Sequence, residues 1–294
     1  MEFVCNFMTA DADPAQWARR REAEGWDLVS VADHFQSSSR AFPHVWVTAA
    51  SMAQATTSVG VTTAFVNNLF RNPVEVAQAA LAMQKISNGR FELGLGAGWA
   101  KDELEAAGMR YPSPGMRAGA FAESAEIIRS LLHSGSSSFR GEHYEIEIEG
   151  LGPVSPTPPP LVGSVGGPRT IREVTPHCDR VELKPASPAT RDGAVDMQRM
   201  SEIRDHDLVD LIAQVRAVDP EIELGVFLLC NIGNDPMTTD LAELMGDGLY
   251  HRFYGSAEKF ADGVAWLAEL GISRCQVSPF DDKSFTSLAP ALFR

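Results

Sequence analysis

The most regular pattern of hydrophobic and polar positions lies between residues 72 and 99. Apolar side chains recur at helical spacing over residues 73–87, and Asn88-Gly89 then favours the end of a helix. A short apolar run follows and leads into the sequence GAGW at residues 96–99. The pattern predicts a helix and then a buried parallel strand that ends in glycines and a large aromatic residue. In α/β proteins, ligands bind at this end of the sheet.

Strand-like and helix-like segments alternate along the whole chain. The strand-like segments lie near residues 3–8, 28–32, 58–65, 91–95, 160–164, 179–183, 222–229 and 274–278. The helix-like segments lie near residues 14–25, 45–56, 73–87, 101–107, 116–133, 168–175, 207–218 and 256–270. Eight strands that alternate with helices over 294 residues predict an α/β fold of the (β/α)8 TIM-barrel type rather than an open sheet.

Two insertions interrupt this alternation, near residues 134–160 and 230–254. The first contains the alternating sequence HYEIEIEG followed by PVSPTPPP, which predicts a small hairpin and then a stiff proline-rich segment. In a barrel, long excursions after strands usually build the wall of a pocket. Because we find no internal repeat and no linker, we expect residues 1–294 to form a single TIM-barrel domain.

The net charge of the chain argues against some kinds of binding partner. A formal net charge of -14 disfavours nucleic acid and anionic membranes, because phosphate groups bind to basic surfaces. No apolar run of about 18 residues and no charged-then-apolar leader is visible, so we expect neither a membrane span nor a signal peptide. The four cysteines are far apart and lie in apolar segments, which is typical of buried reduced thiols. We therefore expect a soluble cytoplasmic protein.

Polar residues and glycines gather at the carboxyl ends of the predicted strands, as a binding pocket requires. Asp33-His34 follows the second strand, and His34 is the best catalytic candidate because a histidine titrates near neutral pH and can donate or accept a proton. Adjacent strand residues point to opposite faces, so Asp33 and His34 are expected to have different roles. The sequence alone leaves open whether the pair acts in catalysis or only caps the next loop.

The glycine-rich segment 163–169 precedes a helix-like segment and contains Gly166 and Gly167. Free amides at a helix N-terminus suit a phosphate, although a tight structural turn is an alternative. Asn67 could bind a flat heterocycle or form a turn, and Trp99 could stand beside a cofactor or form a packed lid. The sequence has no dinucleotide-binding or P-loop signature and no ligand spacing typical of a metal site.

Five motifs, in the same order as in the family, make the chain resemble the luciferase-like monooxygenase superfamily. Within it, the resemblance is to the branch of oxidoreductases that use the deazaflavin coenzyme F420. The motifs are ADHF at 32–35, NNLFRNP at 67–73, SNGRFELGLGAGW at 87–99, VGSVGGPRTIRE at 162–173 and GSAEKFADGVAWLAELGISR at 255–274. The resemblance covers nearly the whole chain.

The resemblance implies a TIM barrel with insertions, a homodimer, and a flavin or deazaflavin at the carboxyl ends of the strands. It implies that Asp33 contacts the cofactor and that His34 faces the substrate as a proton donor or stabiliser. It also implies a bulge with a non-prolyl cis peptide at about Ala64-Phe65, behind the cofactor ring, with Asn67 hydrogen-bonded to that ring. The residues implied to line the phosphate and ribityl chain are Ala97, Gly98, Gly166 and Gly167.

Two departures from the family bear on the substrate. Relatives that oxidise a sugar phosphate have a glutamate where Trp99 stands and a tryptophan where Ser38 stands, which argues against that substrate here. Trp99 is instead expected to line the substrate pocket. Lys184 is a candidate for binding a phosphate of the substrate.

Three functions remain to be weighed at this point. The leading hypothesis is hydride transfer between coenzyme F420 and an organic carbonyl, alcohol or activated alkene. The second is a monooxygenase that uses reduced FMN supplied by a partner reductase. The third is a non-catalytic barrel that binds a flavin or a metabolite. Oxygen dependence separates the first two, because a deazaflavin lacks N5 of the flavin ring and does not readily form a peroxide.

Overall fold

Parallel strands form a closed barrel in the computed structural model, which describes residues 1–37 and 40–293. The barrel strands in this part of the chain are β1 (Glu2–Phe7), β2 (Leu28–Val31), β5 (Gly60–Thr63), β7 (Phe91–Gly96), β10 (Leu161–Val165), β11 (Arg180–Leu183), β12 (Glu223–Ile232) and β14 (Arg274–Pro279). Around the barrel the order is β10–β11–β12–β14–β1–β2–β5–β7, and β10 also pairs with β7 to close the ring. The predicted strands and the predicted (β/α)8 TIM barrel are confirmed.

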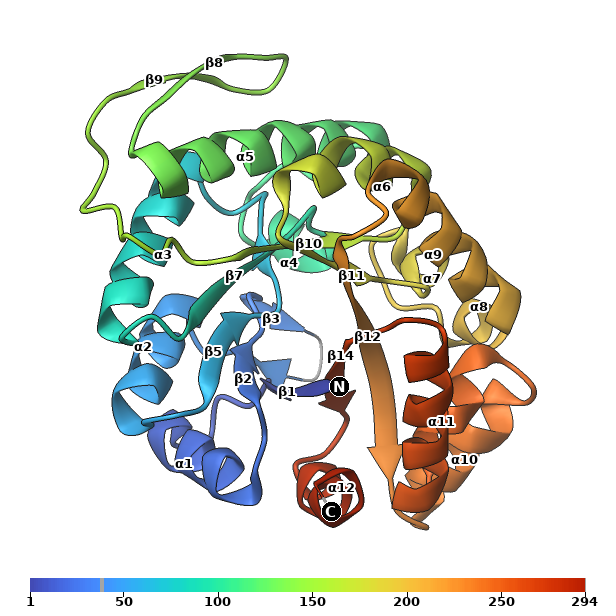
Figure 1. Cartoon of the computed structure of the whole chain (residues 1–294). Coiled ribbons are helices and arrows are strands. Elements are labelled where there is room, and N and C mark those ends of the chain that lie inside the picture. The colour runs from blue at the N-terminus through green and yellow to red at the C-terminus, as the bar shows by residue number, and fades with distance from the viewer. Residues whose placement is uncertain (38–39, 294) are drawn as a thin grey trace.

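Helices surround the strands, as Figure 1 shows. The helices that match the predicted segments are α1 (Pro14–Glu24), α2 (Val45–Ala55), α3 (Pro73–Ile86), α4 (Lys101–Ala106), α5 (Pro114–Ser134), α6 (Pro168–Val174), α9 (Asp205–Val218) and α11 (Ala257–Glu269). Further helices that the sequence pattern does not predict are α7 (Ser187–Thr190), α8 (Met197–Ser201), α10 (Pro236–Met245) and α12 (Lys283–Leu292). The first two span only one turn or slightly more, so they are too short to show a hydrophobic period.

The ends of α3 show how the local sequence sets an element that leads to the site. The Asn72 side chain accepts a hydrogen bond from the Val74 amide at 2.9 Å, and Pro73 occupies the first helical turn. After the helix, Asn88 and Gly89 have φ angles of 56° and 84°, a left-handed conformation that ends a helix. The predicted stop at this dipeptide is therefore confirmed. The chain then enters β7 in the direction that brings the GAGW sequence to the carboxyl end of the barrel.

The amino end of the barrel is closed by paired charges, which we call the floor cluster: Arg180, Arg274, Glu2 and Glu92. The Arg274 guanidinium is 2% exposed and donates to Glu2 Oε2 from Nε at 2.9 Å and to Glu92 Oε1 from Nη2 at 2.9 Å. Arg180 also donates to Glu2, at 2.9 Å. Because β14 and β7 lie on opposite sides of the ring, the contact between Arg274 and Glu92 crosses the interior. Buried charges of this kind require close partners, and the floor cluster supplies them.

A second polar layer follows nearer the carboxyl end of the barrel. The Asn6 side-chain amide donates to Ser278 Oγ at 3.0 Å, and Ser30 Oγ donates to Asn6 Oδ1 at 3.1 Å. These buried residues belong to the neighbouring strands β14, β1 and β2. Their hydrogen bonds satisfy polar groups that would otherwise be costly to bury.

The first insertion is a β-hairpin, as predicted. Strands β8 (Ser137–Arg140) and β9 (Glu145–Ile148) pair in antiparallel fashion, and the hairpin projects from the ring of helices at the top of Figure 1. The Glu123 carboxylate on α5 accepts hydrogen bonds from the amides of Glu142, His143 and Tyr144 at 2.7, 2.9 and 3.0 Å. One carboxylate therefore fixes the turn of the hairpin to the body of the barrel.

The second insertion differs from the expected irregular excursion near 230–254. β12 continues to Ile232, because Asn231 and Ile232 pair with a short strand, β13 (Tyr254–Gly255). The helix α10 follows, and the Asp235 side chain caps it by accepting from the Thr238 amide at 3.1 Å. The prediction therefore ended the strand too early and missed one helix.

Two further findings concern composition. Within residues 1–37 and 40–293, no helix combines the length and the apolar character needed to cross a membrane. The cysteines are all free thiols, with Cys5, Cys230 and Cys275 buried and Cys178 partly buried. This agrees with the expectation of reduced thiols.

Candidate active site

His34 lies at the carboxyl end of β2 and is held by a buried carboxylate. Its Nδ1 is 2.8 Å from Oε1 of Glu103, which is 3% exposed and lies on α4. The other oxygen of Glu103 accepts the Phe35 amide at 2.8 Å. Because an ionised carboxylate can only accept, we assign the Nδ1 proton of His34 to this hydrogen bond. Nε2 is then the ring nitrogen left to exchange a proton with a ligand.

Aromatic side chains surround this imidazole. The Phe42 ring centre lies 4.9 Å and the Trp99 ring centre 5.6 Å from that of His34. The side chain of His34 retains 19% exposure, so the ring can still be reached by a small molecule. Trp99 is partly buried and is fixed at its carbonyl by the Tyr111 hydroxyl at 3.0 Å. The arrangement gives a proton-exchanging group within an apolar wall.

Asp33 points away from His34 and binds the next loop. Its carboxylate accepts the Asn67 amide at 2.9 Å and pairs with the Arg71 guanidinium through both oxygens. Asp33 is 4% exposed. The two residues have different surroundings, as the alternation of a strand predicts. The carboxylate of Asp33 fixes the backbone of Asn67, so it acts on the pocket through that segment.

The bulge implied by the family resemblance is present after β5. The peptide bond between Ala64 and Phe65 is cis, at the position expected from the sequence. Both residues are buried, at 8% and 9% exposure. A Cβ added at Gly94 would lie 1.9 Å from the Thr63 carbonyl oxygen, so this strand must carry a glycine where the bulge passes. The sequence of β7 therefore accommodates the bulge.

Two residues expected to bind the cofactor meet beyond this bulge. Asn67 is 4% exposed, and its Oδ1 accepts the Leu69 amide at 3.0 Å. Gly98 has a φ of 76°, and a Cβ there would lie 2.3 Å from the same Oδ1. Only glycine fits this position without displacing Asn67. Ala97, next to it, is half-buried at the mouth of the barrel.

The glycine-rich turn after β10 has one closed and one open position. A Cβ at Gly166 would lie 1.8 Å from Ser187 Oγ, so protein already fills the space beside this residue. Beside Gly167 nothing lies within 4 Å of an added Cβ. The Thr170 hydroxyl donates to the Gly167 carbonyl at 3.0 Å and holds the turn at the start of α6. A ligand can therefore approach the backbone at Gly167, whereas Ser187 occupies the space beside Gly166.

Lys184 follows β11 and carries an ammonium group among aromatic rings. Its Nζ lies 4.9 Å from the ring centre of Phe65 and 4.9 Å from that of Phe227. Burial lowers the pKa of Lys184 to about 8. Two residues earlier, Glu182 is 1% exposed, and burial raises the pKa of its carboxyl group to about 7. Removal of each group from water disfavours its charged form.

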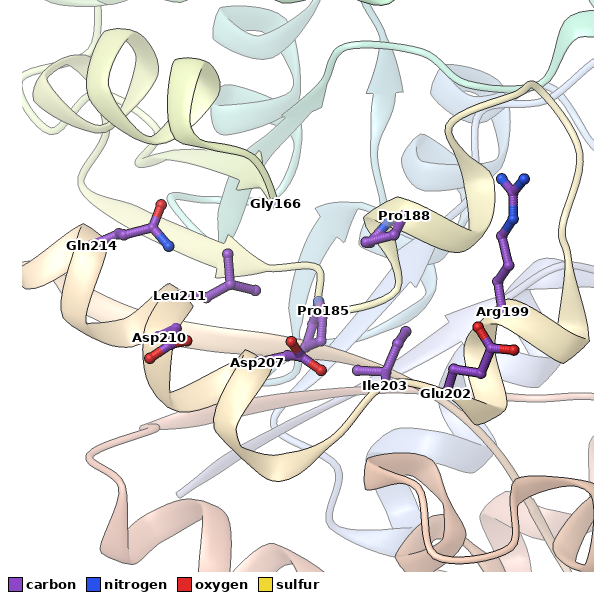
Figure 2. A pocket seen from close by; sticks show the side chains of 10 residues that line it. All are labelled: Gly166, Pro185, Pro188, Arg199, Glu202, Ile203, Asp207, Asp210, Leu211 and Gln214. Carbon is purple, nitrogen blue, oxygen red and sulfur yellow. The ribbon is translucent and has the colours of Figure 1, made fainter.

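A cavity of about 470 Å³ lies on the outer side of the glycine-rich turn and not at His34. Figure 2 shows its walls, which come from the end of β10, the segment after β11, and helices α8 and α9. The residues that line it are Gly166, Pro185, Pro188, Arg199, Glu202, Ile203, Asp207, Asp210, Leu211 and Gln214. Its charged side chains are three acidic residues and one arginine, and none of the residues predicted for catalysis lines it, so we base the candidate active site on the geometry at His34 and not on the size of this cavity.

Glu103 and Arg71 contact the predicted site residues but were not expected from the sequence. A signal for Glu103 was available, because an acidic residue in the first turn of the helix after the GAGW exit lies at the mouth of the barrel. Its pairing with His34 joins positions 69 residues apart and follows only from the closed barrel. Ser38, one of the two departures from sugar-phosphate oxidising relatives, lies outside the described residues.

Known proteins share both the sequence family and the fold. The family model described as luciferase-like monooxygenase matches residues 11–218. The F420-dependent glucose-6-phosphate dehydrogenase of Amycolatopsis mediterranei (strain U-32) is 34% identical over 160 residues, which make up 53% of this chain and 48% of that protein. The chain spans about half the length of the curated relatives it matches, with 48%, 46% and 48% of three such proteins covered.

Two solved structures illustrate the likeness in fold. An F420-dependent secondary alcohol dehydrogenase in complex with an F420-acetone adduct superposes with a TM-score of 0.74 at 19% identity and covers 99% of this chain and 98% of that one. The monooxygenase RslO1 from Streptomyces bottropensis superposes with a TM-score of 0.75 at 15% identity, with the same coverage of 99% and 98%. At these identities the likeness establishes the barrel fold.

Proposed function

The chain belongs to the luciferase-like monooxygenase family, and we propose that it is an oxidoreductase that transfers a hydride between coenzyme F420 and a small organic carbonyl, alcohol or activated alkene. The observation that carries the proposal is the His34–Glu103 pair at the barrel mouth, next to the Ala64–Phe65 bulge. The names of the curated relatives support the choice of cofactor, because several are F420-dependent dehydrogenases.

The residues at the mouth fit such a cofactor. Gly167 leaves open space beside its backbone, which suits a phosphate or a ribityl chain, and Gly166 shapes the same turn. Asn67 and Gly98 lie against each other beyond the bulge, with Ala97 beside them, where a flat ring could rest. In this proposal Ala64 and Phe65 support the ring from behind, and Asp33 keeps Asn67 in place. The residues proposed to hold the cofactor are Asp33, Ala64, Phe65, Asn67, Ala97, Gly98, Gly166 and Gly167.

His34 exchanges the proton that accompanies hydride transfer. When bound, coenzyme F420 supplies or accepts the hydride. In the reducing direction, Nε2 of His34 donates a proton to the substrate oxygen, and in the oxidising direction it accepts one from an alcohol. Glu103 holds the ring in one orientation and stabilises the positive charge of the imidazolium. Phe42 and Trp99 limit water around the imidazole.

The pocket favours a substrate other than a sugar phosphate. Trp99 places an apolar ring 5.6 Å from His34, at the position where relatives that oxidise a sugar phosphate have a glutamate. We therefore propose that Trp99 and Lys184 line the substrate pocket and that the substrate lacks a row of hydroxyl groups. The name of the Amycolatopsis mediterranei relative describes that protein's substrate only.

Titration of the purified protein with coenzyme F420 and with FMN, followed by fluorescence, tests the proposal. We expect F420 to bind at least about tenfold more tightly than FMN. The reduced F420 complex should then convert carbonyl or enone substrates at the same rate with and without oxygen. Tighter binding of FMN together with oxygen-dependent turnover would instead establish the alternative function, a monooxygenase that needs a partner reductase.

We also propose a cytoplasmic homodimer. The dimer is what the family resemblance implies, and the exposed apolar side chain of Val47 on α2, at 69%, does not by itself mark an interface. Free thiols at Cys5, Cys178, Cys230 and Cys275 suit a reducing compartment. Analytical ultracentrifugation should give twice the mass of one chain, and a monomer at micromolar concentration would contradict the dimer.

A further inference from the structure

Lys184 brings a cation to the mouth of the barrel, and no carboxylate of the described residues lies within ion-pair distance of it. Its Nζ faces the rings of Phe65 and Phe227 at 4.9 Å each. Among residues 1–37 and 40–293 this nitrogen has no hydrogen bond and no contact ion pair, and the carboxyl group of Glu182 acts on it only through a longer-range charge interaction. The side chain is half-buried, so part of it can still meet a ligand. A partly buried ammonium group without a contact ion pair is strongly stabilised by an anionic ligand that enters the pocket.

The carboxyl group behind Lys184 limits the charge of that anion. Glu182 is buried on the same face of β11, and its Oε1 has no hydrogen-bond partner in the described part of the chain. The charge of Arg274 acts on Glu182, but the hydrogen bonds of its guanidinium go to Glu2 and Glu92. Glu182 and Lys184 together therefore carry at most one net positive charge. One negative charge on a ligand would balance it, and a second would remain uncompensated.

The topology places this cation across the mouth from β2. β2 and β11 lie on opposite sides of the ring of strands, while Phe65 follows β5, which pairs with β2. The contact with Phe65 therefore brings Nζ of Lys184 away from its own strand and toward the side that carries His34. The two groups are placed to hold the two ends of one small molecule.

We propose that Lys184 selects substrates that carry a single carboxylate, bound at its ammonium group between Phe65 and Phe227, with the reacting carbon directed toward His34. The inference rests on the proposed function, because it names the substrate class of that same site. A phosphate dianion usually takes several donors, whereas the described residues place the single ammonium group of Lys184 here, next to a buried carboxyl group. The aromatic walls suit a flat apolar body between the two ends of the substrate.

The test compares ligands that differ only in this charge. The protein is first titrated with coenzyme F420 and then, in the F420-saturated state, with two matched pairs: benzoate against benzamide, and crotonate against crotonamide. Inorganic phosphate is titrated as well. We expect each carboxylate to bind at least about tenfold more tightly than its amide, as a charge-assisted contact does. Phosphate should bind more weakly than benzoate.

Matched variants locate the effect. Lys184→Met keeps a similar length without the charge and should reduce the ratio of carboxylate to amide affinity to about one. Lys184→Arg should restore most of the ratio, which shows that a loss in the methionine variant is not a folding defect. Lys85→Met removes an exposed lysine from the outside of α3 and should leave the ratio unchanged.

Three results would overturn the inference: equal affinity for both members of each pair in the wild type, a preference that persists in Lys184→Met, or tighter binding of phosphate than of benzoate. Loss of F420 affinity in Lys184→Met would also overturn it, because Lys184 would then serve the cofactor. If F420 does not bind the wild type at all, the proposed function fails, and the same ratios measured on the cofactor-free protein still decide the inference.

Discussion

At the amino end of the barrel, Arg274 donates to Glu2 and Glu92, whereas at the carboxyl end Lys184 faces two phenyl rings. Glu182 lies between these ends with an oxygen that has no donor within the described residues. Both regions bury ionisable side chains inside the same barrel. At the floor each charge is matched by protein, so the charges serve the fold. At the mouth, the described residues place no carboxylate within ion-pair distance of Lys184, so its ammonium group is available to a ligand.

The comparison also explains why an unpaired charge is tolerated at the mouth. An isolated buried ion costs several kcal/mol, and a protein avoids this cost by keeping the group neutral or by leaving it near solvent. Lys184 is half-buried, and burial lowers its pKa to about 8. Burial raises the pKa of Glu182 to about 7. Both groups therefore titrate close to physiological pH.

The largest effect is expected where the floor cluster is broken. Arg274→Met leaves Glu92 without its principal cation and should lower the free energy of unfolding by about 3–5 kcal/mol, as measured by urea denaturation. Arg140→Met is the matched control, because the ion pair of Arg140 with Glu145 is 83% and 68% exposed. The control should change stability by less than about 0.5 kcal/mol. If both variants lose the same free energy of unfolding, the buried charges of the floor cluster stabilise the fold no more than an exposed ion pair does.

At the mouth, the largest effect is expected on catalysis and not on stability. His34→Ala should lower kcat by about 10²–10⁴-fold, because the proton donor is removed, while the affinity for F420 stays within about twofold. Steady-state kinetics and the fluorescence titration measure the two quantities. His206→Ala, which removes a histidine whose side chain is 73% exposed, is the control. Full activity of His34→Ala would refute its catalytic role.

We expect Glu103 to affect catalysis only through its hydrogen bond with His34. Glu103→Gln removes the negative charge that stabilises the imidazolium and should lower kcat by about 10–100-fold with a smaller change in KM. Glu105→Gln on the same helix, where the side chain is 55% exposed, should leave both unchanged. In a double variant with His34→Ala, the effect of Glu103→Gln should disappear, since a positioning residue acts only through its partner. Additive losses would assign Glu103 a separate function.

The smallest effect concerns the pH dependence of stability at Glu182. Its folded pKa of about 7 lies above the ordinary 4.5, so the folded state binds this proton more tightly than the unfolded state. The stability that this group contributes is present below pH 4.5 and is lost as pH rises through about 7.

Glu182→Gln removes this loss. The stability of the variant relative to wild type should therefore increase by about 1–3 kcal/mol between pH 4.5 and pH 8. Urea denaturation at both pH values measures the difference. If the difference in free energy of unfolding between variant and wild type does not change with pH, the pKa of Glu182 is not raised. The contrast in charge burial between the mouth and the floor cluster would then not hold.

The sequence predicts the barrel well because each strand and each long helix has a local pattern of its own. The helices α7 and α8 are missed because four or five residues cannot show a period, and α10 is missed because Asp235-Pro236 resembles a loop. His34 and Lys184 are visible as strand-end residues. The partner of His34 is not, since Glu103 is 69 residues away, and neither is the floor pair of Arg274 and Glu92, which are 182 residues apart. Such pairs exist only once the ring of strands has closed.

The β8–β9 hairpin has a consequence for how proteins of this architecture diversify. Its Tyr144 hydroxyl accepts a hydrogen bond from the Asn68 side chain at 3.3 Å, next to Asn67, while the Glu123 carboxylate fixes its turn to α5. The hairpin thus reaches the pocket without supplying a barrel strand, although Phe139, Ile146 and Ile148 pack against the core. A mutant library confined to residues 137–148 that keeps these apolar side chains would change selectivity and leave the barrel strands unchanged. Selection acting on this one segment could therefore produce new specificities more readily than changes to the strands themselves.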